Sequence, residues 1–392
     1  MELNNRNIAM ASCYEAPYGS NFIRMLTALA ERLKSEYNCK IYLIFPEQPS
    51  KYWITELQSR FTVGFTRKPY RKSTPDFLRM FHEWQIDLVH THFEAYDEPV
   101  AKAVKCTGHD IHMVWHLHDN ITLDKTGLSI PLIRKLKTHI SFWLHYGYWG
   151  KKAYFVPVST EVGNIENHYR NHFFSFPNEE LPNEILEKVQ LIRGEVVING
   201  IDMSRIEAKY PYELPKGKIR FLTFGGHTIR KGIPTILDAA EKLESYGIDF
   251  MLSITKGVGT LDYINQRYAN QLPTWLVLLD QTENICALFD SHSCFISAAL
   301  KETMSMAIAE ASIYGLPVIQ SNIAGTWWNS SNPSTFLFHV GNADDLSNKM
   351  IEVIKANRVN LKEKCRETSE NNYMLLSMQR WCGKIIEIYK KV

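Results

Sequence analysis

Two carboxylates of this 392-residue chain, Glu302 and Glu310, stand where a polar ligand could bind. The apolar run from Cys294 to Ala298 predicts a strand end, and Met304 to Ile313 predicts a helix that starts just after Glu302. N–H groups at a helix start lack an intrahelical partner and can bind phosphate. A carboxylate inside an apolar helix is costly to bury unless something pairs with it, and sugar or ribose hydroxyls would be suitable partners. The simpler interpretation is a salt-bridged helix glutamate and an exposed turn glutamate.

A basic turn earlier in the chain could complete such a site. Lys231 stands directly before Gly232, at the predicted start of the helix Ile233–Ser245. A helix N-terminus with an adjacent lysine can clamp a diphosphate, because the helix dipole and the ammonium group both attract negative charge. The alternative is an exposed basic pair on a turn, formed with Arg230.

Strand patterns alternate with helix patterns along most of the chain. The expected strands cover Asn7–Ser12, Lys40–Phe45, Asp87–His90, Met113–Leu117, Ala153–Ser159, Glu195–Ile198, Ile219–Phe224, Asp249–Thr255, Trp275–Leu279, Ser293–Ser297 and Pro317–Ile319. Helical spacing of apolar residues predicts a helix over Asn21–Tyr37 and another over Leu375–Lys391. Strands separated by helices predict parallel, doubly wound sheets, in which ligands bind beyond the carboxyl ends of the strands. His92 and His118 fall at such ends.

The length predicts two domains, because a single hydrophobic core rarely serves 392 residues. We expect an N-terminal domain over residues 1–202 and a C-terminal domain over residues 203–373, with the polar stretch Pro211–Lys218 in the crossing between them. The closing segment, residues 374–392, carries the last amphipathic helix.

The composition is that of an ordinary folded protein, with 45% hydrophobic and 22% charged residues. A net charge of +2 argues against wholesale nucleic-acid binding, and seven scattered cysteines without a CxxC pair favour reduced thiols. The first residues lack a signal-peptide pattern, and no apolar run reaches the roughly 18 residues of a membrane span. We therefore expect a cytoplasmic protein, either free or at the inner face of a membrane.

Five motifs in order resemble those of retaining glycosyltransferases with the GT-B fold, in family four (glycosyltransferases group 1). They are Asp87-Leu-Val-His-Thr-His92, Trp115-His-Leu-His-Asp119, Asn199-Gly-Ile-Asp202, Phe224–Gly232 and the glutamates of Glu302–Glu310. The resemblance implies an α/β protein with two Rossmann-like, doubly wound parallel-sheet domains facing each other across a cleft. It also implies that the last helix crosses back to the first domain. Each motif is weak alone, so the inference rests on their order.

The same resemblance assigns roles to the residues at matching positions. His118 and Glu302 would be the catalytic residues at the donor sugar. The nucleotide-sugar would be bound by Gly19, Arg230, Lys231, Met304, Ser305, Met306 and Glu310, with Glu310 on the ribose. Asp119 and His92 would contact the acceptor or support His118.

The implied reaction is the transfer of a hexose-type sugar, with retention at the anomeric carbon, to an acceptor hydroxyl. The donor would be a UDP- or GDP-sugar and the acceptor a glycan or a lipid-linked glycan, in polysaccharide or glycoconjugate biosynthesis. The GT-B class implies no cofactor and no metal, and no Asp-x-Asp motif is present.

Two departures from the family pattern leave alternatives open. Gly226 stands where the family usually has an arginine five residues before Lys231, and the turn Glu302–Ser305 lacks the family's glycines. Arg230 is expected to supply the missing charge. A catalytically idle GT-B module used for binding or assembly is one alternative, and a sugar-phosphate epimerase or phosphorylase of the same fold is another.

The pairs His90/His92 and His116/His118 support a different class of function. Strand alternation places both members of each pair on one side of the sheet. Two such pairs at adjacent strand ends could ligate zinc and activate water, as in a metal-dependent hydrolase. This alternative leaves the two glutamates without a role, so we expect no metal site.

The segment Lys125–Lys152 is basic and rich in aromatic residues, with six Lys or Arg and no acid. Apolar residues from Leu132 to Leu144 recur at helical spacing. Such a helix can lie on an anionic membrane, which would give peripheral contact through residues 130–152. A helix packed against the core with a solvated basic face is the interpretation that we favour.

Overall fold

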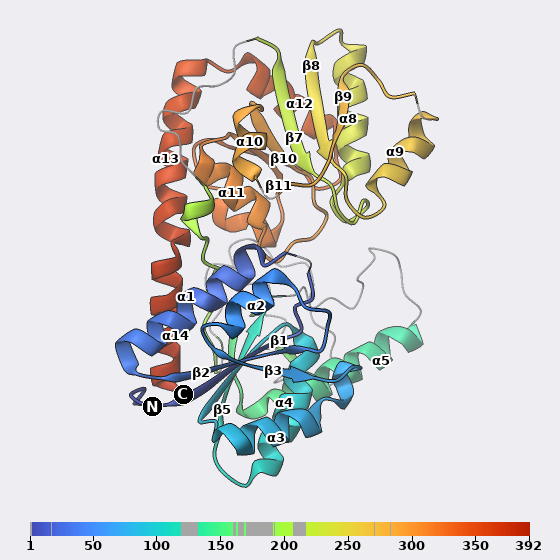
Figure 1. The fold of residues 1–392 in the computed structure, drawn as a ribbon. Helices are drawn as coiled ribbons and strands as arrows, with labels where there is room; N and C mark the ends of the chain where they lie inside the picture. Colours follow the sequence, from blue (N-terminus) through green and yellow to red (C-terminus); the bar gives the residue numbers. More distant parts are fainter. Residues whose placement is uncertain are drawn as a thin grey trace. The chain divides into compact units, whose positions relative to one another are not determined.

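The computed structural model describes residues 2–16, 18–118, 132–159, 162–163, 168–169, 191, 193–206, 217–269, 271–282 and 284–392. The chain divides into two compact units (Figure 1). Unit 1 is Met1–Gly200 with Met378–Val392, and unit 2 is Ile201–Ser377. The sequence placed the corresponding boundaries after residues 202 and 373.

Unit 1 contains a six-stranded parallel sheet with the strand order β3-β2-β1-β4-β5-β6. Its strands are β1 (Asn7–Ser12), β2 (Lys40–Pro46), β3 (Thr62–Thr66), β4 (Leu88–His92), β5 (His112–Leu117) and β6 (Tyr154–Pro157). Its helices are α1 (Ser20–Tyr37), α2 (Tyr52–Gln58), α3 (Thr74–Trp84), α4 (Asp97–Thr107), α5 (Leu132–Phe142) and α14 (Met378–Lys391).

Helices cover both faces of this sheet, because its central strands are apolar on both sides. Every residue of β4 is buried. On one face, α1 and α14 share a hydrophobic core, in which Leu26 and Leu33 of α1 join Trp381 and Ile385 of α14. On the other face, the core includes Phe77 and other residues of α3 and α4.

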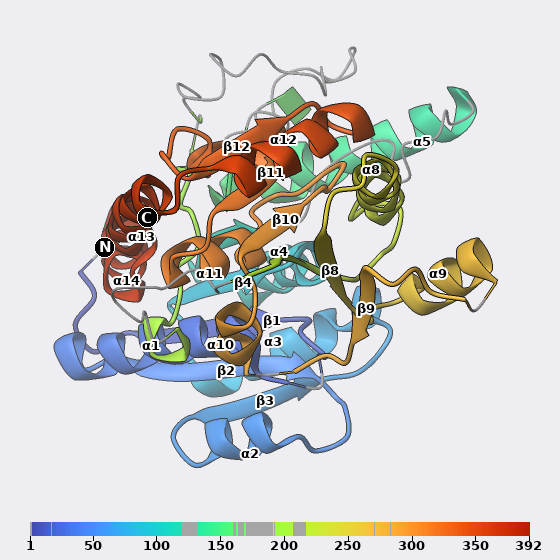
Figure 2. The same cartoon turned by 90° about the horizontal axis from the view of Figure 1, so that it is seen from above.

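Unit 2 contains a second six-stranded parallel sheet, with the order β12-β11-β10-β7-β8-β9. Its strands are β7 (Ile219–Phe224), β8 (Phe250–Thr255), β9 (Leu276–Leu279), β10 (Cys294–Ser297), β11 (Val318–Ser321) and β12 (Thr335–Phe338). Its helices are α8 (Ile233–Ser245), α9 (Thr260–Tyr268), α10 (Ile285–Asp290), α11 (Met306–Tyr314), α12 (Ala343–Lys355) and α13 (Arg358–Leu376). Figure 2 shows β9 and α9 at one edge of this sheet.

Counted from their own first strands, the two sheets have the same topology. In unit 1, β1 lies between β2 and β4, and in unit 2, β7 lies between β8 and β10. The strand order therefore reverses direction beside the first strand of each unit, which is the doubly wound α/β arrangement predicted from the sequence.

The last helix corrects a prediction. The sequence suggested one helix over Leu375–Lys391, whereas α13 ends at Leu376 and α14 begins at Met378, with Ser377 extended between them. Ile201 pairs with Ser377, and its N–H donates to the carbonyl of Leu376 at 2.7 Å. This pairing holds the backbone extended and breaks the helix where unit 2 ends.

A second correction concerns Glu195–Ile198, which the sequence predicted to be a strand. Glu195 N–H donates to the Phe155 carbonyl at 3.0 Å, and Val197 N–H donates to the Pro157 carbonyl at 3.0 Å. The segment thus follows β6 but has no strand assignment apart from one isolated bridge at Gly194.

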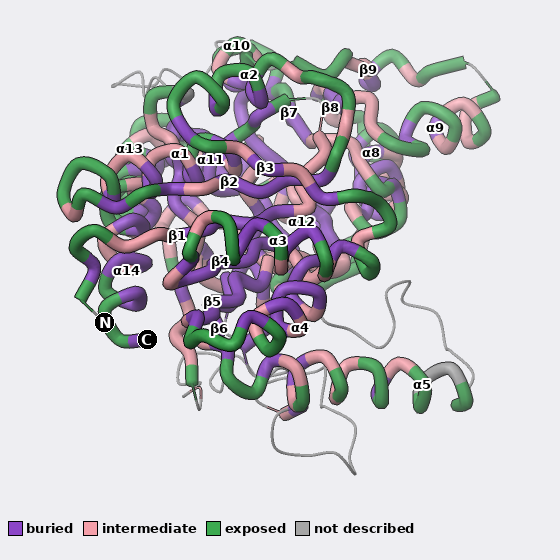
Figure 3. Tube along the Cα trace, turned by 60° about the horizontal axis from the view of Figure 1, so that its bottom comes forward, coloured by how far each residue is buried: buried purple, intermediate pink, exposed green. Residues whose placement is uncertain are grey.

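Helix α5 presents apolar side chains to solvent, contrary to the packed helix that we favoured. Leu132 and Ile133 are 73% and 72% exposed, and Leu136, Ile140 and Leu144 are also exposed. Figure 3 shows α5 projecting from unit 1, mostly in the colours of exposed and half-buried positions. Among the helices that the structure describes, none is long and apolar enough to cross a membrane.

Candidate active site

The polar residues predicted in the second half of the chain lie at the point where the strand order of unit 2 reverses. The loop 225–232 follows β7 and leads to α8, and the loop 298–305 follows the neighbouring strand β10 and leads to α11. Two helices therefore begin at the carboxyl ends of two adjacent parallel strands. Ligands of open α/β sheets bind at this position.

Glycine allows these two loops to touch through their backbones. Gly232 has a φ of +69°, and a Cβ atom there would stand 1.9 Å from the Ala298 carbonyl oxygen. Close by, the N–H of Leu300 donates to the Arg230 carbonyl at 2.8 Å. The contact fixes residues 230–232 against residues 298–300 and so brings Lys231 beside the second loop.

Lys231 and Glu302 form an ion pair across the two loops, between Nζ and Oε1. Their side chains are 30% and 11% exposed, so the pair is partly shielded from water. Because the attraction between two charges is stronger where water is partly excluded, this pair fixes the side chain of Glu302. The structure therefore brings together two residues that lie 71 positions apart in the sequence.

Gly325 supports the Glu302 loop, although no sequence pattern selects it. A Cβ atom at Gly325 would stand 1.7 Å from the carbonyl oxygen of Glu302. Only a glycine allows this approach without moving the loop. No local pattern marks the residue, because the contact depends on the turn of residues 324–329, which follows a different strand.

The start of α11 presents free backbone donors near Glu302. Ser305 caps the helix, and its side chain accepts the N–H of Ile308 at 3.4 Å. The N–H groups of Met306 and Ala307 point out of the first turn, because an α-helix offers them no carbonyl. Met304 and Ser305 are buried and Met306 is half-buried.

Glu310 lies within α11 and is only 8% exposed. Its neighbours in the helix are apolar and buried, as the sequence indicated. A carboxylate in these surroundings needs polar partners to offset the loss of its hydration.

Arg230 and Lys231 are adjacent but lie in different environments. Arg230 is exposed, whereas Lys231 is half-buried and paired with Glu302. A Cβ atom at Gly226 would lie 3.7 Å from Lys231 Cγ, so the position opposite Lys231 is lined by backbone rather than by the arginine usual in the family.

In unit 1, four histidines from β4, β5 and the residue after β5 stack on one face of the sheet. The ring centroids of His116 and His118 lie 4.3 Å apart, and those of His90 and His92 lie 4.2 Å apart. This confirms that each pair shares a side of the sheet. His92 Nδ1 lies 3.0 Å from His118 Nε2, and the Asn199 side-chain amide lies 3.4 Å from His118 Nδ1. Asn199 thus reaches a candidate catalytic residue that the sequence did not connect with it.

Loss of hydration keeps these imidazoles neutral. Burial lowers the pKa of His118 to about 3, and burial together with neighbouring His118 lowers the pKa of His90 to about 3. The pKa values of His92 and His116 are lowered well below the usual value for the same main reason. At neutral pH, His118 can therefore take part in hydrogen bonds but carries no charge.

The fold and the sequence of unit 2 place the chain among known enzymes. A crystal structure of a glycosyltransferase from Rickettsia africae is similar to it with a TM-score of 0.73 and 17% identity, covering 99% of this chain and 98% of that one. A structure of Alr3699/HepE from Anabaena in complex with UDP-glucose has a TM-score of 0.74 and 14% identity, covering 98% and 100%. Residues 204–373 match the family described as glycosyl transferases group 1. Most of unit 2 therefore matches that family in sequence, and the whole chain shares the fold of these solved structures.

A curated relative of this chain comes from Klebsiella pneumoniae. It is described as an uncharacterized 41.2 kDa protein in cps region, and it is 21% identical over 292 residues, which are 71% of this chain and 78% of that protein.

Two candidate site residues remain, Gly19 and Asp119, both from the part of the sequence that belongs to unit 1. Gly19 is buried and precedes α1 with a φ of −64°, a conformation open to any residue. Crowding is the constraint there, because a Cβ atom would lie 3.3 Å from Trp53 Cβ. Asp119 lies outside the described residues.

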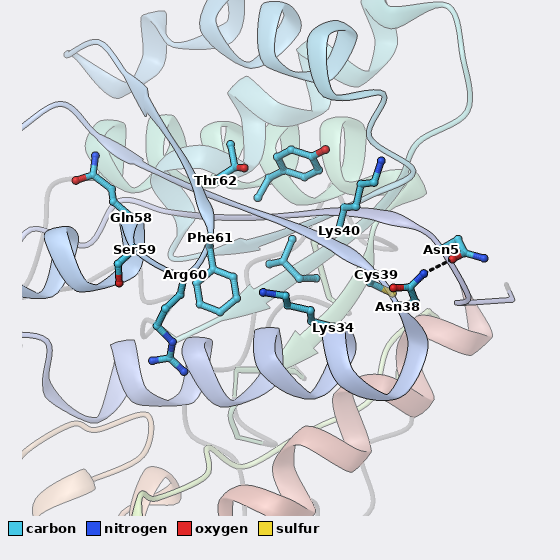
Figure 4. A pocket seen from close by; sticks show the side chains of 12 residues that line it. Asn5, Lys34, Asn38, Cys39, Lys40, Gln58, Ser59, Arg60, Phe61 and Thr62 are labelled. Atoms are coloured by element: carbon cyan, nitrogen blue, oxygen red, sulfur yellow. Dashed lines mark hydrogen bonds between the residues drawn. The ribbon is translucent and has the colours of Figure 1, made fainter.

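A cavity of about 730 Å³ lies elsewhere in unit 1, at the amino ends of β2 and β3. Lys34, Lys40 and Arg60 are among its lining residues (Figure 4), and Arg60 is paired with Glu31. None of the candidate site residues lines this cavity. It is at the wrong edge of the sheet for ligand binding in an open α/β fold.

Proposed function

We propose that this protein is a glycosyltransferase that transfers a hexose-type sugar from a UDP- or GDP-sugar to a hydroxyl of a glycan or lipid-linked glycan, with retention at the anomeric carbon. The observation that carries the proposal is the Lys231–Glu302 ion pair, held between two helix N-termini where the strand order reverses. The pair offers a cation for a diphosphate and a carboxylate for sugar hydroxyls in the same place.

Charge stabilisation is the main task of such a site. As the sugar leaves, negative charge develops on the nucleotide diphosphate, and preorganised cations and N–H donors lower the energy of that state. Lys231 and the first N–H groups of α8 and α11 would supply them. Glu302 would then release part of its hold on Lys231 and accept hydrogen bonds from the donor sugar. Glu310 would accept them from the ribose.

Retention follows if the acceptor attacks from the face that the diphosphate leaves. The bond between the anomeric carbon and the phosphate oxygen breaks, and a bond to the acceptor oxygen forms. The acceptor proton passes to a departing phosphate oxygen, so the enzyme needs no nucleophile. We propose that unit 1 binds the acceptor and that neutral His118 donates or accepts a hydrogen bond at the donor sugar.

The Anabaena structure supports a uridine nucleotide, since it was solved with UDP-glucose. That finding belongs to a protein with only 14% identity, so the base and the sugar are open to test in this chain. A panel of UDP, GDP, ADP and their sugar conjugates, added without metal, would reveal the donor by thermal shift. A ligand that binds only the native state raises the melting temperature.

We expect one nucleotide to stabilise the wild-type chain and to lose most of that effect in Glu310→Ala. The anomeric configuration of the transferred sugar, determined by NMR and compared with that of the donor, would then test retention. A chain that no nucleotide stabilises would refute the assignment of the donor site.

A catalytically idle module remains the second candidate, because of Gly226. Gly226 stands where the family usually has an arginine, so this position cannot add a second positive charge beside Lys231. Release of free sugar from the donor, or its transfer to an acceptor, would exclude this candidate. Nucleotide binding without either reaction would support it.

We also propose that α5 makes peripheral contact with an anionic membrane. Its exposed apolar side chains include Leu132, Leu136 and Ile140, and exposed Lys137 and Lys152 belong to the same segment. An apolar stripe accompanied by cations binds the boundary between headgroups and acyl chains. A bilayer could therefore cover this solvent-exposed apolar face.

Sedimentation with vesicles tests this contact. Binding should increase with the fraction of anionic lipid, and it should weaken when Leu132 and Leu136 become serine. A matched control is Val359→Ser, since Val359 is 73% exposed on α13 of unit 2. Equal sedimentation of both variants with anionic vesicles would refute the role of α5.

A further inference from the structure

Three of the stacked histidines of unit 1 have ring nitrogens for which the transferase site gives no use. His90, His92 and His116, which we call the imidazole cluster, are all 0% exposed. Among the described residues, no hydrogen-bond partner contacts Nε2 of His90, Nε2 of His92 or either nitrogen of His116. Buried polar groups are nearly always partnered, so these nitrogens require an explanation.

Two of the three rings already have a partner at Nδ1. His90 Nδ1 lies 2.6 Å from the Tyr389 hydroxyl of α14, and His92 Nδ1 lies 3.0 Å from His118 Nε2. Each of these rings is thus held by Nδ1 and leaves Nε2 unused. Metal-binding histidines show this pattern, because the second nitrogen is usually fixed by a hydrogen bond to a neighbouring group.

The three rings also lie close together. One ligand nitrogen from each ring can be chosen so that all lie within 4.8 Å of one another. Three imidazole nitrogens about 2.0–2.1 Å from a tetrahedral zinc ion would be roughly 3.3–3.4 Å apart. The rings of His90 and His116 are nearly parallel, with 4° between their planes, so the side chains would have to rotate to turn their nitrogens toward one ion.

We propose that the imidazole cluster binds one zinc ion, or a similar divalent transition metal, as a structural site within unit 1. A set of three imidazoles and no carboxylate suits zinc and excludes the hard ions magnesium and calcium. His118 is not a ligand, because both of its nitrogens already have neighbours. This inference departs from our sequence expectation of no metal site.

The burial of the cluster decides against the hydrolase that the histidine pairs suggested. A catalytic zinc site keeps a position open to water and substrate, whereas these three side chains are fully buried. Trp381 of α14 lies over His116, with ring centroids 6.0 Å apart. The ion would instead link β4 and β5 to each other and fix the ring of His92 against His118.

Metal binding by the whole chain tests the proposal. The protein is produced without a polyhistidine tag, stripped with a chelator, and then loaded with Zn²⁺ and desalted. We expect one zinc per chain by elemental analysis and a higher melting temperature in Zn²⁺ than in chelator. Co²⁺ in place of Zn²⁺ should give the visible absorption of cobalt bound to imidazole nitrogens. A folded chain that retains no metal and shows no shift overturns the proposal.

Two variants place the ion within the cluster. His116→Gln should abolish retention of zinc and the thermal shift, whereas His112→Gln, on the same strand but outside the cluster, should leave both unchanged. Zinc retained at full stoichiometry by folded His116→Gln would overturn the proposal. Should His116→Gln fail to fold, the Co²⁺ spectra of the wild type and of His90→Gln would decide instead. The cobalt absorption should be present in the wild type and lost in His90→Gln. None of these measurements needs a donor, so their failure is separate from failure of the transferase assignment.

Discussion

The two sheets of this protein share one topology but carry opposite chemistry at the carboxyl ends of their strands. In unit 2, the loops 225–232 and 298–305 hold the charged pair Lys231–Glu302, which is partly accessible to solvent. In unit 1, the corresponding edge carries stacked histidines that are neutral, because desolvation holds the pKa of His118 near 3. The topology fixes where a ligand can bind, and the loop residues decide what kind of ligand it is.

This difference suggests a division of tasks. A diphosphate needs compensation of its charge, which neutral imidazoles cannot give and a lysine at helix N-termini can. Hydroxyl groups need only hydrogen bonds, which His118 could supply without charge. Variants at the two edges should therefore change different kinetic constants.

Loss of the unit 2 cation should have the largest effect. We expect Lys231→Ala to lower kcat/KM by roughly 10²–10³-fold, or about 2.7–4 kcal/mol, the range seen when one donor to a developing negative charge is removed. Initial rates with the donor identified by thermal shift would measure the loss. Lys242→Ala is the matched control, because Lys242 also pairs with a carboxylate in unit 2, that of Asp344 on α12. Equal losses in both variants would contradict the role of Lys231.

The contact between the two loops should come next. Gly232→Ala combines the cost of a positive φ, roughly 1–2 kcal/mol, with a collision against the Ala298 carbonyl. Gly247→Ala has nearly the same φ, +68°, but has no atom within 4 Å of the added Cβ. Urea unfolding should show a larger loss of stability for Gly232→Ala. Nucleotide binding should weaken in that variant alone, and equal behaviour of the two would contradict the importance of the collision.

The third test compares one variant in each unit. His118→Ala should lower kcat about tenfold, or ~1.4 kcal/mol, and leave the thermal shift by nucleotide intact, because His118 lies in unit 1. Glu310→Ala should mainly raise the donor KM. Steady-state kinetics with both variants would separate the effects, and a loss of nucleotide binding in His118→Ala would contradict the division.

The sequence predicted the eight interior strands and two of the four edge strands, β6 and β9. The ten strands that it placed correctly lie within two residues of their observed bounds, and the interior ones are apolar runs of the kind typical of buried parallel strands. It missed the edge strands β3 and β12. Neither is a continuous buried run, because β3 alternates buried with exposed or half-buried residues and only the last residue of β12 is buried.

The sequence predicted only those candidate site residues that a local sequence pattern marks. Glu302 and Lys231 stand beside helix starts, and Glu310 stands inside a helix that its composition and the following glycine mark. Gly325 and Asn199 act through contacts with segments distant in the sequence, and no local pattern records such contacts. The sequence also could not predict that Leu132 and Leu136 are exposed, because helical spacing shows that a face is apolar but not what covers it.

The smallest expected effect concerns the helix start next to Glu302. Ser305→Ala removes the side chain that accepts the N–H of Ile308, and it should cost about 1 kcal/mol of unfolding free energy. Asn342→Ala removes an equivalent cap from α12, where Asn342 accepts the N–H of Asp345 at 3.0 Å. Both variants should lose similar stability in urea. Only Ser305→Ala should also weaken nucleotide binding, since a frayed first turn of α11 no longer aims its N–H groups at the phosphates. If the Asn342 variant weakened binding as much, general destabilisation would explain the effect, and the start of α11 would have no special part in the donor site.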